Sequence, residues 1–145
     1  MMLVPHACLN AAAGRLIKKP LTAFGIGVAG HAALDLFPHK DVSAHKAEGL
    51  AVLLMLGLVG TSCGWSSPSF WCAMGGVIPD VEQVLPWTDP KRGRRRWFPT
   101  HTRPRHSRPL PGAPDYRAPL LTQSVISLAA LMLAVTGCSR GRCKS

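Results

Sequence analysis

Residues 49–79 read GLAVLLMLGLVGTSCGWSSPSFWCAMGGVIP, a run of 31 positions without Asp, Glu, Lys, Arg or His. A second such run, residues 118–139, covers 22 positions. Since about 20 apolar residues cross a bilayer as an α-helix, the second run predicts one spanning helix and the first is long enough for most of two. Residues 20–34 carry no formal charge and predict another helix. We therefore expect an all-α integral membrane bundle of about four transmembrane helices.

This interpretation divides the chain into five parts. Residues 1–19 are predicted to form a short surface segment, because their charges follow their apolar residues and the order is wrong for a secretory signal. The remaining parts are three membrane helices within residues 20–86, a basic Pro-rich loop at 87–119, a fourth helix at 120–138 and a basic tail at 139–145. The expected helix bounds are about 20–37, 47–63, 70–85 and 120–138.

The loop at residues 87–119 differs in character from the rest of the chain. It holds nine of the 17 Lys and Arg residues and seven of the 13 Pro residues, so it cannot bury a core and is predicted to be extended or flexible. With four helices, this loop and the link near residue 40 lie on one side of the membrane with eleven basic residues, while both termini lie on the other side with six. The positive-inside bias places the loop in the cytoplasm. The expected localisation is therefore a cell membrane, with the basic loop on its cytoplasmic side.

Metal-ligating side chains gather just after the first predicted membrane helix. His31 and Asp35 are four residues apart, so on a helix they leave the same face about one turn from each other. Pro38 is expected to end the helix and to deliver His39 and Asp41 from the loop that follows. Four potential metal ligands therefore meet at one helix end.

Two further groups of such residues are predicted on the same side of the membrane. Asp80 and Glu82 end the third apolar helix, where carboxylates are costly unless they serve a function or a partner. His101 and His106 lie in the basic loop. The three groups together predict one metal site at the cytoplasmic rim. The alternative is structural: these polar groups cap helix ends and form salt bridges with the basic loop.

Three motifs resemble a known family. They are GGVIPDVE at residues 75–82, HTRPRHS at residues 101–107 and the H-x-x-x-D spacing of His31 and Asp35. The combination resembles the predicted membrane-bound metal-dependent hydrolases of the bacterial inner membrane. The resemblance implies that Asp80 and Glu82 form an acidic pair and that His101 and His106 form a histidine pair.

Mixed imidazole and carboxylate ligands suit Zn, Mn or Fe, and an open coordination position would let a bound water attack a phosphoryl or acyl centre. The preferred ligands are His31, Asp35, Asp80 and His106. The predicted further ligands are His39 and Asp41, and the predicted catalytic residues are Glu82 and His101. A phospholipid or lipid-linked phosphate is the favoured substrate, held by the guanidinium groups of Arg94, Arg95, Arg96, Arg103 and Arg105.

A second functional class remains open. The chain carries a net charge of +10, and a basic Pro-rich loop can bind anionic lipid or nucleic acid without a fixed site. The alternative function is therefore a non-enzymatic membrane protein whose Arg-rich loop binds such a partner. Membrane lipids are the favoured partner, and nucleic acid is the less favoured one.

Glycines in the first membrane helix have two interpretations. Gly25, Gly27 and Gly30 match the G-x-G-x-x-G dinucleotide motif, but that motif requires a preceding strand and is not supported in an uncharged helical stretch. The small residues Ala23, Gly25, Gly27 and Ala29 are better explained as a close helix-packing face.

The five cysteines contain no C-x-x-C pair, which argues against a thiolate zinc site. On the non-cytoplasmic side a disulfide such as Cys63 with Cys72 is permitted. Buried apolar positions are the preferred alternative for Cys72 and Cys138.

Overall fold

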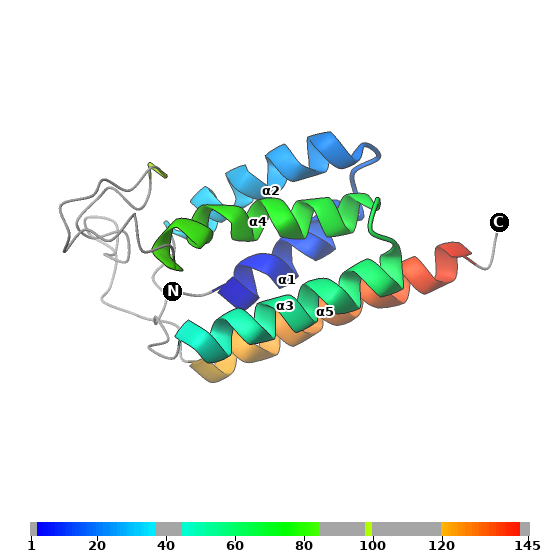
Figure 1. The fold of residues 1–145 in the computed structure, drawn as a ribbon. Coiled ribbons are helices and arrows are strands. Elements are labelled where there is room, and N and C mark those ends of the chain that lie inside the picture. Colours follow the sequence, from blue (N-terminus) through cyan, green and yellow to red (C-terminus); the bar gives the residue numbers. More distant parts are fainter. Residues whose placement is uncertain (1–2, 37–44, 85–97, 100–119, 143–145) are drawn as a thin grey trace.

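The computed structural model describes residues 3–36, 45–84, 98–99 and 120–142. Five α-helices make up nearly all of this part of the chain, and successive helices run in opposite directions (Figure 1). The prediction of an all-α protein is confirmed, and all four predicted helices are present. The helices are α1 Leu3–Gly14, α2 Pro20–Leu34, α3 His45–Cys63, α4 Pro68–Val84 and α5 Leu120–Arg142.

The long uncharged run at residues 49–79 is divided between α3 and α4. Gly64 follows the last residue of α3 and has a φ of 98°, a left-handed conformation that glycine adopts without steric cost. Pro68 then begins α4, where its missing N–H is not needed for a helical hydrogen bond. The run therefore forms two antiparallel helices, as its length predicted.

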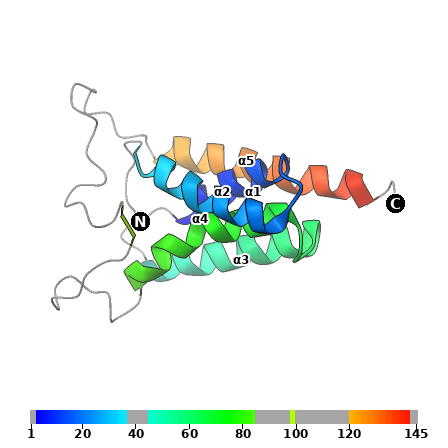
Figure 2. The same ribbon diagram turned by 90° about the horizontal axis from the view of Figure 1, so that it is seen from above.

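The first helix, α1, is enclosed by the other four, with α2 and α4 on one side and α3 and α5 on the other (Figures 1 and 2). The prediction of a surface segment is therefore wrong for residues 3–14. Leu3, Ala7 and Ala11 are buried, and Gly14 lies against the start of α4. These residues recur at helical spacing, and three of them are small enough for neighbouring helices to approach closely.

The extra helix also changes the predicted arrangement of the termini. Within the described residues the number of helices is odd, so α1 begins at one end of the bundle and α5 finishes at the other (Figure 1). The prediction that both termini share one side is wrong for this reason. Asp35 at the end of α2 and Asp80 near the end of α4 lie at the end of the bundle where α1, α3 and α5 begin. We call this the cluster end, because the side chains of His6, His31, Asp35 and Asp80 meet there.

Helices α2 and α4 pack closely through glycine. A side chain at Gly27 would overlap the backbone of Cys72, and one at Gly75 would overlap the backbone of Phe24. Each helix therefore presents a glycine to the main chain of the other. This close contact holds the ends of α2 and α4 next to each other.

Of the four small residues predicted to form the packing face of α2, two are buried and two are exposed. Ala23 and Gly27 are buried, whereas Gly25 and Ala29 are exposed. Residues four apart lie on the same side of a helix, while residues two apart do not. The buried line of α2 therefore continues from Ala23 and Gly27 to His31 and not through Gly25.

Only α5, among the described helices, is long and apolar enough by itself to cross a membrane. Its stretch Leu121–Cys138 has 18 residues and a mean hydropathy of 1.7. Pro20–Leu34 and Ala47–Cys63 are apolar but shorter. The length of the described helices thus supports one membrane span where the sequence predicted about four.

A disulfide joins α3 to α5 at the end opposite the cluster end. It links Cys63 to Cys138, whose Cα atoms are 4.9 Å apart. The predicted pairing of Cys63 with Cys72 is wrong, because Cys72 is a free, buried residue on the face of α4 that contacts α2. The prediction of a buried apolar role is confirmed for Cys72 and is wrong for Cys138.

We expect the double variant C63S/C138S to lose about 2–4 kcal/mol of unfolding free energy, because the bond closes a loop across 75 positions of the chain. Equilibrium denaturation of the purified protein measures this loss. A reductant should lower the stability of the wild type by the same amount and leave the variant unchanged. Equal thiol labelling of denatured protein before and after reduction would contradict the assignment.

Candidate metal centre

His31 and Asp35 form the first half of the site. His31 is fully buried on α2, and Asp35 directly follows the helix. The Nε2 atom of His31 lies 3.3 Å from Oδ2 of Asp35. The prediction that these two side chains share one helix face is confirmed, and it follows from their spacing of four residues.

Asp80 reaches the same place from α4. Its Oδ1 atom lies 3.9 Å from Nε2 of His31, and its side chain is buried. The close glycine contact between α2 and α4 makes this approach possible. Pro79 lies inside α4 and has no N–H, so it cannot supply the helical hydrogen bond to the carbonyl of Gly75. The next carbonyl, that of Gly76, accepts a hydrogen bond of 2.8 Å from Nδ1 of His31.

The fourth member of the cluster, His6, comes from α1. Its Nε2 atom lies 3.8 Å from Oδ1 of Asp35, and its Nδ1 atom lies 3.8 Å from Oδ2 of Asp80. The two imidazoles also meet directly, with their Nδ1 atoms 3.0 Å apart. Asn10, one turn later on α1, donates a hydrogen bond of 2.8 Å to the carbonyl of His6. Each imidazole thus contacts both carboxylates.

The hydrogen bond to Gly76 fixes how His31 presents its ring. A carbonyl oxygen can only accept, so Nδ1 of His31 carries the proton. In the neutral ring, Nε2 then directs its lone pair toward the carboxylates of Asp35 and Asp80. A proton or a metal ion between these atoms would satisfy the nitrogen and the carboxylate oxygens together. Histidines that bind metal commonly donate their other N–H to a backbone carbonyl, as His31 does here.

The residues can hold a metal ion. His6, His31 and Asp80 each offer one ligand atom, these atoms lie within 4.8 Å of one another, and all three residues are buried. Ligand atoms about 2 Å from a tetrahedral zinc lie about 3.3 Å from each other. The separations of 3.3 Å and 3.9 Å from His31 Nε2 to Asp35 and Asp80 are therefore close to what a bound ion requires. We refer to His6, His31, Asp35 and Asp80 as the His–Asp cluster.

An aromatic ring from the segment between α4 and α5 borders the cluster. The centroid of Phe98 lies 5.3 Å from that of His31, and the two rings meet edge to face. An apolar ring beside the imidazole reduces the access of water from this direction. Low water content strengthens the electrostatic interactions among the four cluster side chains.

Several predicted site residues lie outside the described residues. Glu82 belongs to the last turn of α4, but its side chain is not among those described. The structure thus brings together His31, Asp35 and Asp80 and leaves the other predictions as they stand. The residues outside the described part are His39, Asp41, His101, His106, Arg94, Arg95, Arg96, Arg103 and Arg105.

Sequence reasoning missed His6. The prediction of a surface segment for residues 1–19 placed this histidine at the opposite side of the membrane. A signal was present nevertheless: Leu3, Ala7, Ala11 and Gly14 form a helical stripe that suits a buried helix. His6 and Asn10 lie beside this stripe, one turn apart.

Comparisons of the chain with protein-family models, with curated protein sequences and with solved structures gave no match. The resemblance to membrane-bound metal-dependent hydrolases therefore rests on the three short motifs. The geometry of the His–Asp cluster is the independent observation from which a function can be argued.

Proposed function

We propose that this protein is a membrane-bound metal-dependent hydrolase that acts on a phospholipid or lipid-linked phosphate. The observation that carries the proposal is the buried group of His6, His31 and Asp80, with Asp35 in contact with both imidazoles. Imidazole and carboxylate ligands suit Zn, Mn or Fe. Such an ion, when bound, lowers the pKa of a coordinated water and polarises a phosphoryl oxygen.

The chain's own residues have distinct roles in this proposal. The His–Asp cluster binds the ion, and the Gly76 carbonyl orients His31 through its ring N–H. Glu82 and His101 remain the proposed groups that move protons during hydrolysis. The proposed anion-binding residues are Arg94, Arg95, Arg96, Arg103 and Arg105, and the proposed additional ligands are His39, Asp41 and His106.

The distribution of apolar side chains supports a membrane location. Eight of the 13 buried hydrophobic residues are Ala or Cys, whereas large apolar side chains point outward, among them Leu50 and Leu53 on α3 and Leu121 and Leu133 on α5. Helices in membranes pack through small residues because lipid accepts large apolar groups. Soluble monomers rarely expose apolar patches of this extent. We therefore propose that the bundle, and not α5 alone, lies in the bilayer.

Two features support an orientation with the cluster end in the cytoplasm. The basic segment at residues 85–119 connects α4 to α5 at that end, in agreement with the positive-inside bias. The disulfide between Cys63 and Cys138 lies at the opposite end, where α3 finishes. Disulfides persist in oxidising compartments, which matches a periplasmic position for that end.

The test is metal analysis of the full chain purified in detergent, together with phosphate release from phosphatidic acid in mixed micelles. We expect a stoichiometric transition metal, loss of hydrolysis after chelation and recovery on adding Zn²⁺ or Mn²⁺, because the ion activates the attacking water. Replacing Arg94, Arg95 and Arg96 by Gln should weaken substrate binding and leave the metal content unchanged. The non-enzymatic alternative predicts a different result. The purified protein would contain no metal and release no phosphate, and its binding to anionic vesicles would depend on these arginines.

A further inference from the structure

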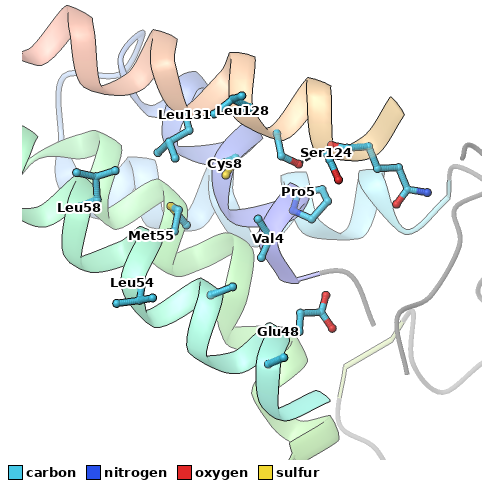
Figure 3. Close-up of a pocket in the computed structure, with 14 residues that line it drawn as sticks. Val4, Pro5, Cys8, Glu48, Leu54, Met55, Leu58, Ser124, Leu128 and Leu131 are labelled. Atoms are coloured by element: carbon cyan, nitrogen blue, oxygen red, sulfur yellow. Dashed lines mark hydrogen bonds between the residues drawn. The ribbon is translucent and has the colours of Figure 1, made fainter. Parts of the chain in front are cut away.

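A cavity of about 650 Å³ lies on the opposite side of α1 from the His–Asp cluster, between α1, α3 and α5 (Figure 3). Its walls come from all three helices, with Cys8 on α1, Leu54 and Met55 on α3 and Leu128 and Leu131 on α5. A volume of this size lies within the range of about 300–1,000 Å³ that is usual for small-ligand sites. The cavity therefore has room for one extended organic molecule.

The polarity of the cavity changes along its length. Glu48 and Ser124 lie at one end, whereas Leu58 and Leu131 lie toward the other (Figure 3). Gln123 and Ser127 add an amide and a hydroxyl to the lining. The Glu48 carboxylate is fixed by the first turn of α1, since its Oε1 atom accepts a hydrogen bond of 2.7 Å from the backbone N–H of Leu3. From Glu48 to Leu58 the wall runs along α3 for about 15 Å.

The polar end of the cavity adjoins the His–Asp cluster through the first turn of α1. Val4 and Pro5 line the cavity, and the next residue, His6, belongs to the cluster. Both sites are at the cluster end of the bundle, because Glu48 and Ser124 stand near the beginnings of α3 and α5. A molecule with its tail in the cavity would therefore have its polar end at the same end of the bundle as the cluster, separated from it by the first turn of α1.

We propose that the cavity binds a hydrocarbon chain of the lipid substrate, with its head group directed past the start of α1 toward the cluster. This inference rests on the proposed function for the identity of the head group. A lipid chain is the occupant that fits, because the walls are almost wholly apolar, the polar groups gather at one end, and the outer surfaces of α3 and α5 carry exposed leucines that bilayer lipid would cover.

The first test uses a lysophosphatidic acid with a diazirine at the end of its chain, photo-crosslinked to the full chain in detergent. Mass spectrometry should find the label on Met55, Leu58 or Leu131, which line the apolar part of the cavity. Leu53 and Met132 are exposed and do not line the cavity. Labelling mainly at these two residues would overturn the proposal. Crosslinks between two protein chains across this surface would also overturn it.

Ala51→Trp is the matching variant, because Ala51 lines the cavity and an indole there would fill it. We expect this variant to lose the label at Leu58 and Leu131. Ala29→Trp is its control, since Ala29 is exposed on α2, and it should keep the wild-type labelling. Labelling of A51W at the wild-type level would contradict the proposal.

Chain length gives a quantitative test. Affinity for unlabelled lysophosphatidic acids should rise about fourfold for each added methylene until the cavity is filled. Affinity that is independent of chain length would contradict the inference. Metal content and phosphate release are measured on the same preparations. Active, metal-bound protein with scattered label would overturn the chain site alone, whereas cavity labelling without metal would overturn the hydrolase proposal alone.

Discussion

We expect His6→Ala to lower the affinity of the protein for its metal by at least about 100-fold and to abolish hydrolysis, although residue 6 lies outside every motif of the sequence. Substitutions of groups that only support metal ligands already cost about 10- to 100-fold, and a lost ligand costs more. His6 contacts Asp35, Asp80 and His31 at separations of 3.0–3.8 Å, so it reaches the other three cluster residues as His31 does. Metal content of the purified variant and phosphate release measure the effect.

The control for this variant is Glu48→Gln, which changes another buried polar residue at the same end of the bundle. Glutamine retains an oxygen that can accept the hydrogen bond from the Leu3 N–H, and Glu48 does not belong to the cluster. The metal content of E48Q should therefore equal that of the wild type. If the cluster instead holds protonated histidines and no metal, His6→Ala would leave metal content unchanged and destabilise the fold by about 3–5 kcal/mol, because two buried carboxylates would lose a partner.

The positions of α2 to α5 could be predicted because long uncharged runs, bounded by charged or Pro- and Gly-containing segments, indicate apolar helices. The predicted bounds differ from the observed ones by only a few residues, since Pro20, Pro68 and the link around Gly64 mark helix limits in the sequence itself. Helix α1 could not be predicted by length, because its 12 residues are too few to span a bilayer. The stripe of Leu3, Ala7, Ala11 and Gly14 indicates a buried helix face, but which helices cover α1 depends on tertiary contacts that no local pattern specifies.

Half of the His–Asp cluster was predictable for a local reason and half was not. His31 and Asp35 meet because of the period of a helix, so their spacing alone was sufficient. Asp80 could be assigned to the same end of the bundle, but its distance from His31 depends on the close approach of α2 and α4. His6 required the tertiary position of α1. The disulfide is a similar case, because Cys63 and Cys138 meet only through the pairing of α3 with α5.

The close approach of α2 and α4 leads to the second large effect. We expect Gly27→Ala to cost about 1–3 kcal/mol of unfolding free energy, the usual cost of overpacking, because the added methyl group would overlap the backbone carbonyl of Cys72. Any shift that relieves this overlap moves α2 away from α4 and lengthens the 3.9 Å separation of His31 and Asp80. Metal affinity should therefore fall together with stability, even though residue 27 is one turn away from the nearest cluster residue.

Gly25→Ala is the matched control on the same helix. A methyl group at this position has no heavy atom within 4 Å, and alanine favours a helix over glycine by about 1 kcal/mol. Its stability should equal or exceed that of the wild type, with unchanged metal content. Denaturant titration in detergent and metal analysis of both variants decide the matter. Equal stability and equal metal affinity of G27A and G25A would show that the α2–α4 contact does not position Asp80. A loss of stability in G27A without a loss of metal would show that this contact stabilises the bundle but is not needed to assemble the metal site.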